Sequence, residues 1–144
     1  MSAAEGFEQA IDASHRALDE ITRGNPDAFF ALYSRAEDAT LANPYGPPAR
    51  GFSEIEQAGR RAAANYRDGR AIEFENFAKY AAADLGYILE IERFETKVAG
   101  GSEITPVALR VTSIFRREDG TWRLLHRHAD PITTSRSGES VIEA

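Results

Sequence analysis

The sequence has no cysteine, few histidines and a deficit of positive charge. It contains three histidines, and its 23 acidic residues outnumber the 17 lysines and arginines, which gives a net charge of −6. The absence of cysteine excludes disulfide bonds and thiolate nucleophiles. The negative charge argues against nucleic acid or an anionic membrane surface as a partner, because both repel an acidic protein.

Long apolar runs are missing as well. No stretch approaches the length of a membrane span, and the first ten residues, MSAAEGFEQA, lack the basic and apolar regions of a signal peptide. We therefore expect a cytoplasmic protein. With 144 residues, of which 42% are hydrophobic and 10% aromatic, the chain is long enough for one domain with a substantial core.

The first half of the chain has the spacing and capping signals of helices. Apolar residues at helical intervals predict a first helix over residues 4–22. Asn25 is placed to cap a second helix, because a proline follows it at the first turn. Ser53 and Glu56 have the spacing of a capping box, which predicts a third helix ending near Tyr66.

The rest of the chain is typical of strands. A short strand is expected over residues 39–42, followed by irregular structure over residues 43–51, which hold three prolines and two glycines. Asp119 and Gly120 supply the positive φ angles of a tight hairpin turn. Four long strands are predicted, at residues 71–82, 85–98, 103–117 and 121–130.

Helices first and a meander of strands after them predict an α+β fold. We expect a curved, mostly antiparallel sheet that wraps the three N-terminal helices on one face. Its other face needs cover or stays half solvated, and we expect a homodimer through that face. Residues 132–144 form a polar tail with little to bury, which is either loose or exchanged within a dimer.

The last strand carries a row of ionisable residues. Side chains alternate faces along a strand, so Trp122, Leu124, His126, His128 and Asp130 are predicted to share one face. That face is apolar at its start and ionisable at its end. Such an order suits a strand that leaves a packed core and enters a polar cavity, and also a strand that emerges into solvent.

The preceding strand adds two polar residues. Arg110 and Thr112 alternate with an apolar set that we expect to pack in the core, and they are predicted to lie within reach of the same site as the histidines. Arg110 would hold a carboxylate or an enolate through its fork of donors. It could instead pair with a glutamate across the strands.

The two strand histidines have two interpretations. Histidine titrates near neutral pH, so His126 or His128 could act as general acid or base, with Asp130 or Glu92 orienting it. They could equally be structural, hydrogen-bonded to the backbone or to Asp130. No metal site is expected, because zinc requires three or four ligands and His15 lies far away on a helix. No cofactor is expected either.

Tyrosines and polar residues elsewhere in the chain complete the predicted site. Apolar walls with polar tips suit a small aromatic or polyketide-like carbonyl compound, although the same residues also suit a core. Asn43 and the proline-rich loop after it are expected to form a lid or rim. The residues predicted to contact a ligand are Arg110, Thr112, Tyr33, Asn43, Tyr45, Tyr66, Tyr80 and Glu92.

Several segments resemble a known superfamily. EDATLANPYGPPARG, the helix start SEIEQA, VALRVTSIFRREDGTW and LLHRHAD are similar to segments of the nuclear transport factor-like domains. Within these, the SnoaL-like proteins and the association domain of calmodulin-dependent kinase look nearest. The resemblance runs from about Glu8 to Pro131. It implies a single domain over residues 1–131, with the cystatin-like α+β fold, in which the sheet forms a cone-shaped barrel around an internal pocket.

The resemblance implies no single activity. The superfamily includes ketosteroid isomerases, polyketide cyclases, dehydratases and epoxide hydrolases, and also members that only bind or assemble. In the ketosteroid isomerases the catalytic base is an aspartate before the proline of a similar segment. That position is Asn43 here, and an amide cannot abstract a proton. The tyrosine that donates to the oxyanion falls near Ala17, so a steroid-isomerase mechanism is disfavoured. The family often has serine at the position of Asp130, which here places a carboxylate beside His128.

Two functions therefore remain open. The first is a domain that binds a small carboxylate- or carbonyl-containing hydrophobic ligand in its cone pocket and works as a homodimer. The alternative is a cofactor-independent lyase, isomerase or cyclase, with His128 and Asp130 as acid/base pair and Arg110 as oxyanion holder. The missing acid at Asn43 favours the first, and the carboxylate of Asp130 favours the second.

Overall fold

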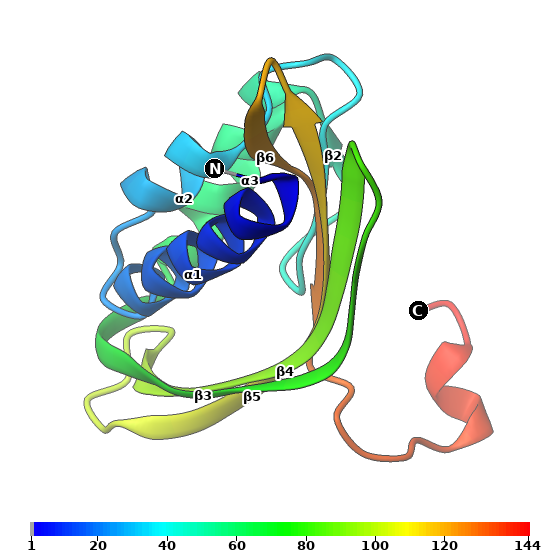
Figure 1. Ribbon diagram of the computed structural model, residues 1–144. Helices are drawn as coiled ribbons and strands as arrows, with labels where there is room; N and C mark the ends of the chain where they lie inside the picture. Colours follow the sequence, from blue (N-terminus) through cyan, green and yellow to red (C-terminus); the bar gives the residue numbers. More distant parts are fainter. Residues whose placement is uncertain (1) are drawn as a thin grey trace.

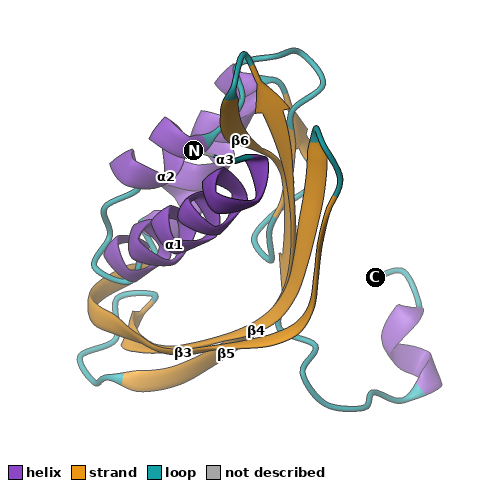
Figure 2. Ribbon diagram, in the orientation of Figure 1, coloured by secondary structure: helices purple, strands orange, loops and turns teal. Residues whose placement is uncertain are grey.

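The computed structural model describes residues 2–144, in which three α-helices lie on the concave side of a strongly curved sheet (Figure 1). Figure 2 shows the helices as one layer and the strands as the other. The predicted α+β fold is therefore confirmed. The elements are α1 (Ala3–Ile21), α2 (Asp27–Leu32), β1 (Thr40–Ala42), β2 (Ala49–Arg50), α3 (Phe52–Ala63), β3 (Tyr66–Ala81), β4 (Leu85–Val98), β5 (Thr105–Glu118), β6 (Thr121–Asp130) and the 3-10 turn η1 (Gly138–Val141).

The sheet is mixed but mostly antiparallel. Its six strands are ordered β2-β1-β6-β5-β4-β3, and β1 and β6 are the parallel pair. The strands β2 and β3 are free edges, so the predicted barrel is an open cone rather than a closed one. The helix α1 packs across the concave face against β3 and β6. A cone of this shape encloses its core on the concave side and leaves the convex side uncovered.

The first two helices begin close to where the sequence predicts. The hydroxyl of Ser2 accepts a hydrogen bond from the backbone N–H of Glu5 at 3.1 Å and caps α1. The helix α2 begins after Pro26, and the side-chain oxygen of Asn25 accepts from the N–H of Asp27 at 3.1 Å. Asn25 therefore makes the predicted kind of capping contact, one residue before the position expected of a cap.

The third helix differs from its prediction at both ends. It begins at Phe52 after Gly51, whose φ of 80° makes the turn, and no side chain caps it. Ser53 lies inside the first turn, so the predicted capping box is wrong. The helix ends at Ala63, and Tyr66 already belongs to β3. The loop before the helix also contains β2, which was predicted as irregular.

The β5–β6 hairpin has the predicted turn and an unpredicted bulge. Asp119 and Gly120 both have positive φ, 50° and 81°, as a tight hairpin requires. Farther along, Leu124 pairs with Phe115 but His126 pairs with Ile114, so Leu125 is an extra residue in β6. A single extra residue reverses which face the following side chains occupy.

The bulge divides the predicted row of β6 between two faces. Trp122 and Leu124 are buried on the concave face, where they join the core. Beyond the bulge, Arg127 is buried in their place while His126 and His128 are on the convex face. The prediction that Trp122 and Leu124 share a face with His126 and His128 is therefore wrong.

The convex face and the C-terminal tail expose apolar side chains. On the convex face Tyr80 is 59% exposed, Leu85 48% and Tyr87 39%. The tail runs along the convex side without packing on the sheet, and residues 131–144 are all exposed (Figure 1). Val141 and Ile142 in the tail are therefore apolar side chains without a partner in the core. Within residues 2–144, no helix combines the length and apolar character needed to cross a membrane.

Candidate functional site

A small cavity lies between the helices and the concave face of the sheet. Its volume of about 50 Å³ gives room for roughly three to five water molecules. The walls are mainly apolar and come from α1, α2, α3 and the strands, with Leu18, Phe29 and Leu109 among them. Polar side chains enter these walls at a few points, which is the usual composition of a binding site for a small molecule.

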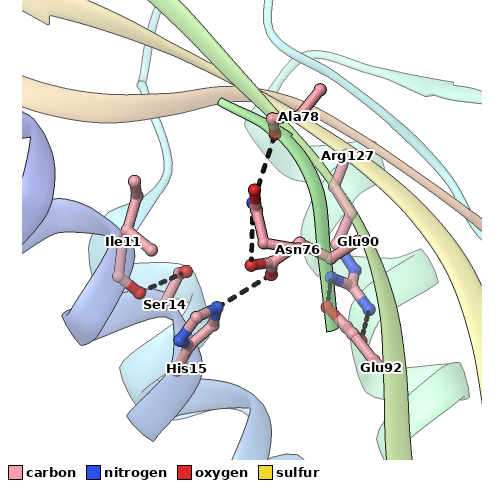
Figure 3. Close-up of polar contacts among 8 residues, drawn as sticks. All are labelled: Ile11, Ser14, His15, Asn76, Ala78, Glu90, Glu92 and Arg127. Carbon is pink, nitrogen blue, oxygen red and sulfur yellow. Dashed lines mark hydrogen bonds and ion pairs between the residues drawn. The ribbon is translucent and has the colours of Figure 1, made fainter. Parts of the chain in front are cut away.

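A buried ion pair forms one polar part of the wall. The two terminal nitrogens of Arg127 lie 2.7 and 2.8 Å from the two carboxylate oxygens of Glu92, and both side chains are less than a tenth exposed. Figure 3 shows the two groups facing each other from β6 and β4. Burial alone would lower the pKa of Arg127, but the neighbouring carboxylate outweighs it and the pKa is raised. Arg127 therefore stays charged, and its charge is matched by Glu92.

A pair of tyrosine hydroxyls forms a second polar part. The oxygens of Tyr45 and Tyr66 lie 2.6 Å apart, and both residues line the cavity. Tyr66 is buried, and burial together with the Tyr45 hydrogen bond raises its pKa, so it stays protonated. Two hydroxyls carry two hydrogens, and the contact between them uses one. Among residues 2–144 neither hydroxyl has a further hydrogen-bond partner.

Asn43 shapes the rim of the cavity. Its amide nitrogen donates to the carbonyl of Ala58 at 3.3 Å, and its oxygen accepts from the backbone N–H of Tyr45 at 2.9 Å. These contacts tie the loop after β1 to α3, and Asn43, Pro44 and Tyr45 all line the cavity. Residues 43–45 of the loop therefore border the cavity, while residues 46–51 do not line it. Asn43 thus acts as a structural clamp that positions Tyr45.

The ionisable residues predicted for the pocket come together elsewhere. Arg110 donates to Asp130 from two nitrogens, at 2.8 and 3.1 Å, and the ring of His128 lies 3.2 Å from the same carboxylate. Thr112 pairs with His128 across the strands, and a ring nitrogen of His126 lies 2.8 Å from the hydroxyl of a threonine on β1. Their predicted proximity is confirmed.

This cluster lies on the convex face, and none of its members lines the cavity. The prediction that Arg110, Thr112, His126, His128 and Asp130 face an internal pocket is therefore wrong. The cause is geometric, because their neighbours on β5 and β6 are the residues whose side chains enter the concave side. Their catalytic or ligand-binding roles stay predictions, now for a site open to solvent.

The convex cluster has its own charge balance. Burial would raise the pKa of Asp130, but the hydrogen bond and charge of Arg110, the backbone N–H of Ile132 and the contact with His128 together outweigh it, and the pKa is lowered. Burial and the charge of His128 lower the pKa of His126. Arg110 is therefore engaged by an ionised partner, as in the cross-strand pairing that the sequence left open, although with Asp130 rather than with a glutamate. Among residues 2–144 no group of three or more acidic or histidine side chains is arranged to hold a metal ion.

Two predicted ligand-binding tyrosines lie outside the cavity. Tyr33 is 1% exposed in the core, and its hydroxyl donates to the carbonyl of Thr40 at 2.8 Å. Burial raises its pKa. Tyr80 lies on the convex face. Of the eight residues predicted to contact a ligand, those that line the cavity are Asn43, Tyr45, Tyr66 and Glu92.

A second buried carboxylate on β4 has a histidine partner. A ring nitrogen of His15 in α1 lies 2.8 Å from Glu90, which is 3% exposed (Figure 3). The same ring stacks on Phe74 with centroids 3.9 Å apart. Asn76 also approaches this carboxylate, at 3.5 Å. Phe74 lines the cavity while His15 and Glu90 do not. The pair therefore joins α1 to the sheet beside the cavity.

Arg127 is a buried charged residue of the cavity wall that the sequence prediction missed. Leu109 and Val111 mark the side of β5 that packs in the core, and a pocket inside the cone must lie on that side. Ala129 pairs with Val111 across the strands, which places Arg127, two residues away, on the same face. This register depends on the bulge at Leu125, and the sequence carries no signal for it.

Comparison with solved structures gives the same fold. A nuclear transport factor 2-like superfamily protein from Salmonella enterica serovar Typhimurium has a TM-score of 0.77 at 14% identity, covering 95% of this chain and 96% of that one. A ketosteroid isomerase-like protein from Erwinia carotovora atroseptica has a TM-score of 0.67 at 20% identity, covering 88% and 94%. A Thiobacillus denitrificans protein assigned to the calcium/calmodulin-dependent protein kinase type II association domains has a TM-score of 0.68 at 24% identity, covering 86% and 93%.

Sequence comparison identifies the family. No curated protein sequence matches the chain. The SnoaL-like domain family matches residues 8–133, which include every helix and every strand of the cone except the first turns of α1. The chain belongs to the SnoaL-like domain family.

Proposed function

We propose that this domain binds a small apolar molecule that carries a carbonyl or carboxylate oxygen, and that it does so in the cone cavity. The observation that supports this most directly is the Tyr45–Tyr66 hydroxyl pair, which sets a spare O–H donor in a mainly apolar wall. Such a donor orients an acceptor oxygen while the apolar walls take the rest of the molecule.

The size of the cavity limits the ligand. A volume of about 50 Å³ suits a molecule of a few heavy atoms and is too small for a steroid or a polyketide ring system. A larger ligand would need the rim loop to move, and Asn43 fixes that loop to α3 through its bond to Ala58. Small carbonyl compounds are therefore the first ligands to test.

The binding function is favoured over the enzyme built on His128 and Asp130. Acid/base catalysis needs the acid and the base within hydrogen-bond reach of the reacting atoms. These two side chains are on the convex face, while the cavity opens on the concave face. A ligand in the cavity is thus out of their reach.

The homodimer is part of the proposal. Tyr80, Leu85 and Tyr87 form an apolar patch on the convex face together with Ile114. Exposed apolar patches commonly mark interaction sites, and a second copy of this chain presents the same patch, so two copies can bury it against each other. The tail runs on this same side with Val141 and Ile142 exposed, which adds apolar surface for the second copy to cover.

Blocking the cavity tests the binding function. Ala62 lines the cavity from α3, so Ala62→Leu should fill it and weaken binding of butanone, propionamide or propionate by at least about tenfold. NMR chemical-shift titration of the full chain measures the affinity. Ala64→Leu is the matched control, since Ala64 is exposed just past the end of α3 and should leave binding unchanged. The proposal fails if none of these compounds binds, or if Ala62→Leu binds them as the unmodified chain does.

A further inference from the structure

We infer that the cavity selects an uncharged carbonyl oxygen over a carboxylate, and that Glu92 is the residue that sets this selectivity. The inference rests on the proposed function, since it names the class of ligand for the same cavity. It also goes against the simplest expectation, because a buried arginine in a pocket wall usually indicates an anion site.

The charge of Arg127 is already matched. Both of its terminal nitrogens face the two oxygens of Glu92 in the parallel, bidentate arrangement that is strongest for this pair. A ligand carboxylate in the cavity would be attracted by Arg127 and repelled by Glu92 from similar distances. The two effects nearly cancel, so the pair acts on the ligand as a dipole rather than as a positive charge.

The cost of removing the ligand from water also favours an uncharged ligand. Moving a carboxylate out of water is costly unless a partner compensates its charge. A neutral carbonyl oxygen costs less, and one good hydrogen bond satisfies it. Within residues 2–144, Arg127 and Arg93 are the basic residues that line the cavity, and the side chain of Arg93, which alternates with that of Glu92 along β4, pairs with Glu75 on β3. A ligand carboxylate therefore finds no unmatched cation there.

The donor for the carbonyl oxygen is the tyrosine pair. Tyr66 is 6% exposed and its neutral hydroxyl lies 2.6 Å from that of Tyr45, a contact in which either hydroxyl can be the donor. The hydrogen that this contact leaves over can be donated to a carbonyl. A neutral phenol donates well to a neutral acceptor, and the stronger bond that it makes to a carboxylate offsets only part of the cost of burying a full charge.

Two isosteric ligands test the selectivity without any substitution. Propionamide and propionate have nearly the same shape and differ in charge, so their dissociation constants compare the two ligand classes directly. Chemical-shift titration of the full chain at neutral pH should give a dissociation constant for propionamide at least about tenfold below that for propionate. Equal affinities, or tighter binding of propionate, would overturn the inference and leave the proposed function standing.

Glu92→Gln tests which residue is responsible. The substitution keeps the shape and removes the charge, so Arg127 becomes an unmatched cation in the wall. Propionate should then bind at least about tenfold more tightly than to the unmodified chain, while propionamide changes by less than about threefold. Glu90→Gln is the matched control: it makes the same change two residues away on β4, at a carboxylate that does not line the cavity. Its ligand preference should be that of the unmodified chain.

An unpaired buried arginine can be strongly destabilising, so Glu92→Gln can prevent folding. In that case the double variant Glu92→Gln/Arg127→Gln replaces the ion pair by two neutral amides, and it should retain propionamide binding while still rejecting propionate. A double variant that binds propionate more tightly than propionamide overturns the inference. If neither compound binds the unmodified chain at all, the proposed function fails, and the inference fails with it.

Discussion

Two tyrosines show how single residues in this fold depend on remaining uncharged. Tyr33 is packed in the core with its hydroxyl donating to a backbone carbonyl, and Tyr66 lies in the cavity wall. Burial raises the pKa of both phenols above the ordinary value near 10. The folded protein therefore keeps two protons that the unfolded chain releases at high pH.

The first prediction follows from this difference. The contribution of the two buried phenols to the free energy of unfolding is complete below about pH 10, where they are protonated in both the folded and the unfolded state. It is lost as the pH rises above that value. Each tyrosine should contribute a slope of about 1.4 kcal/mol per pH unit to the free energy of unfolding. Tyr66→Phe should therefore roughly halve the alkaline loss of stability, as measured by urea unfolding between about pH 9 and pH 11.

The control for this prediction is Tyr80→Phe, which removes a hydroxyl from the exposed convex face. That variant should lose stability as steeply as the unmodified chain. A Tyr66→Phe variant with an unchanged slope would contradict the assignment of Tyr66 as a buried, protonated group.

The sequence predicted some of the individual site residues and missed others. Asn43, Tyr45 and Tyr66 were predicted at the site because a proline-rich loop and aromatic residues suit a rim and a wall. Arg127 was missed, since its role depends on a register that no residue type reveals. His128 was predicted at the site from its chemistry and from an unbroken alternation along the last strand, and the bulge at Leu125 interrupts that alternation.

At the scale of elements, one bulge decides which side chains enter the cone. The extra residue Leu125 keeps Trp122 and Leu124 in the core and also turns Arg127 inward. Strands and turns were predicted well, because alternation and an Asp-Gly pair are local signals. The start of α3 was not, since Gly51 sets it through a positive φ while Ser53 offers a misleading capping pattern.

A junction at Gly69 joins the end of α1 to the strands β3 and β4. Gly69 in β3 donates its N–H to the carbonyl of Thr22 just after α1, at 3.1 Å. The hydroxyl of Thr96 in β4 donates to the same carbonyl at 2.7 Å. A Cβ at position 69 would lie 2.5 Å from the backbone oxygen of Glu95 and 2.6 Å from that of Thr22. Only a residue without a side chain fits this junction.

The second prediction is that Gly69→Ala loosens the attachment of α1 to the sheet. Backbone atoms must move to admit the methyl group, so the free energy of unfolding should fall by about 1–3 kcal/mol in urea denaturation. Gly138→Ala is the control, because a Cβ there meets nothing within 4 Å and the change should stay within about 0.5 kcal/mol. Equal stabilities of the two variants would contradict this account of the junction.

At the scale of the whole molecule, the two faces of the sheet differ in what covers them. The concave face is covered by helices and contains the cavity, while the convex face exposes the apolar patch around Tyr87. The overall fold could be predicted, because three helices followed by a strand meander leave few arrangements. The side of the sheet on which the proposed site lies could not be predicted from the sequence, since both faces of β5 and β6 carry polar residues.

The third prediction concerns the proposed homodimer. Tyr87→Asp places a charge in the middle of the patch, and burying it would cost several kcal/mol, so this variant should sediment as a monomer. Sedimentation velocity of the unmodified chain should give a dimer. Ile104→Asp is the control, because Ile104 is similarly exposed, at 45%, but lies in the loop between β4 and β5. A monomeric unmodified chain, or a dimeric Tyr87→Asp variant, would contradict the proposal.

The central claim is that the ligand site is the cavity inside the cone and not the histidine cluster on the convex face. A crystal structure of the full chain soaked with propionamide tests it most directly. The account predicts the carbonyl oxygen within hydrogen-bond distance of the Tyr45 or Tyr66 hydroxyl, with the ion pair of Arg127 and Glu92 intact. A ligand bound instead beside Arg110 and His128, with the cavity left unoccupied, would contradict it.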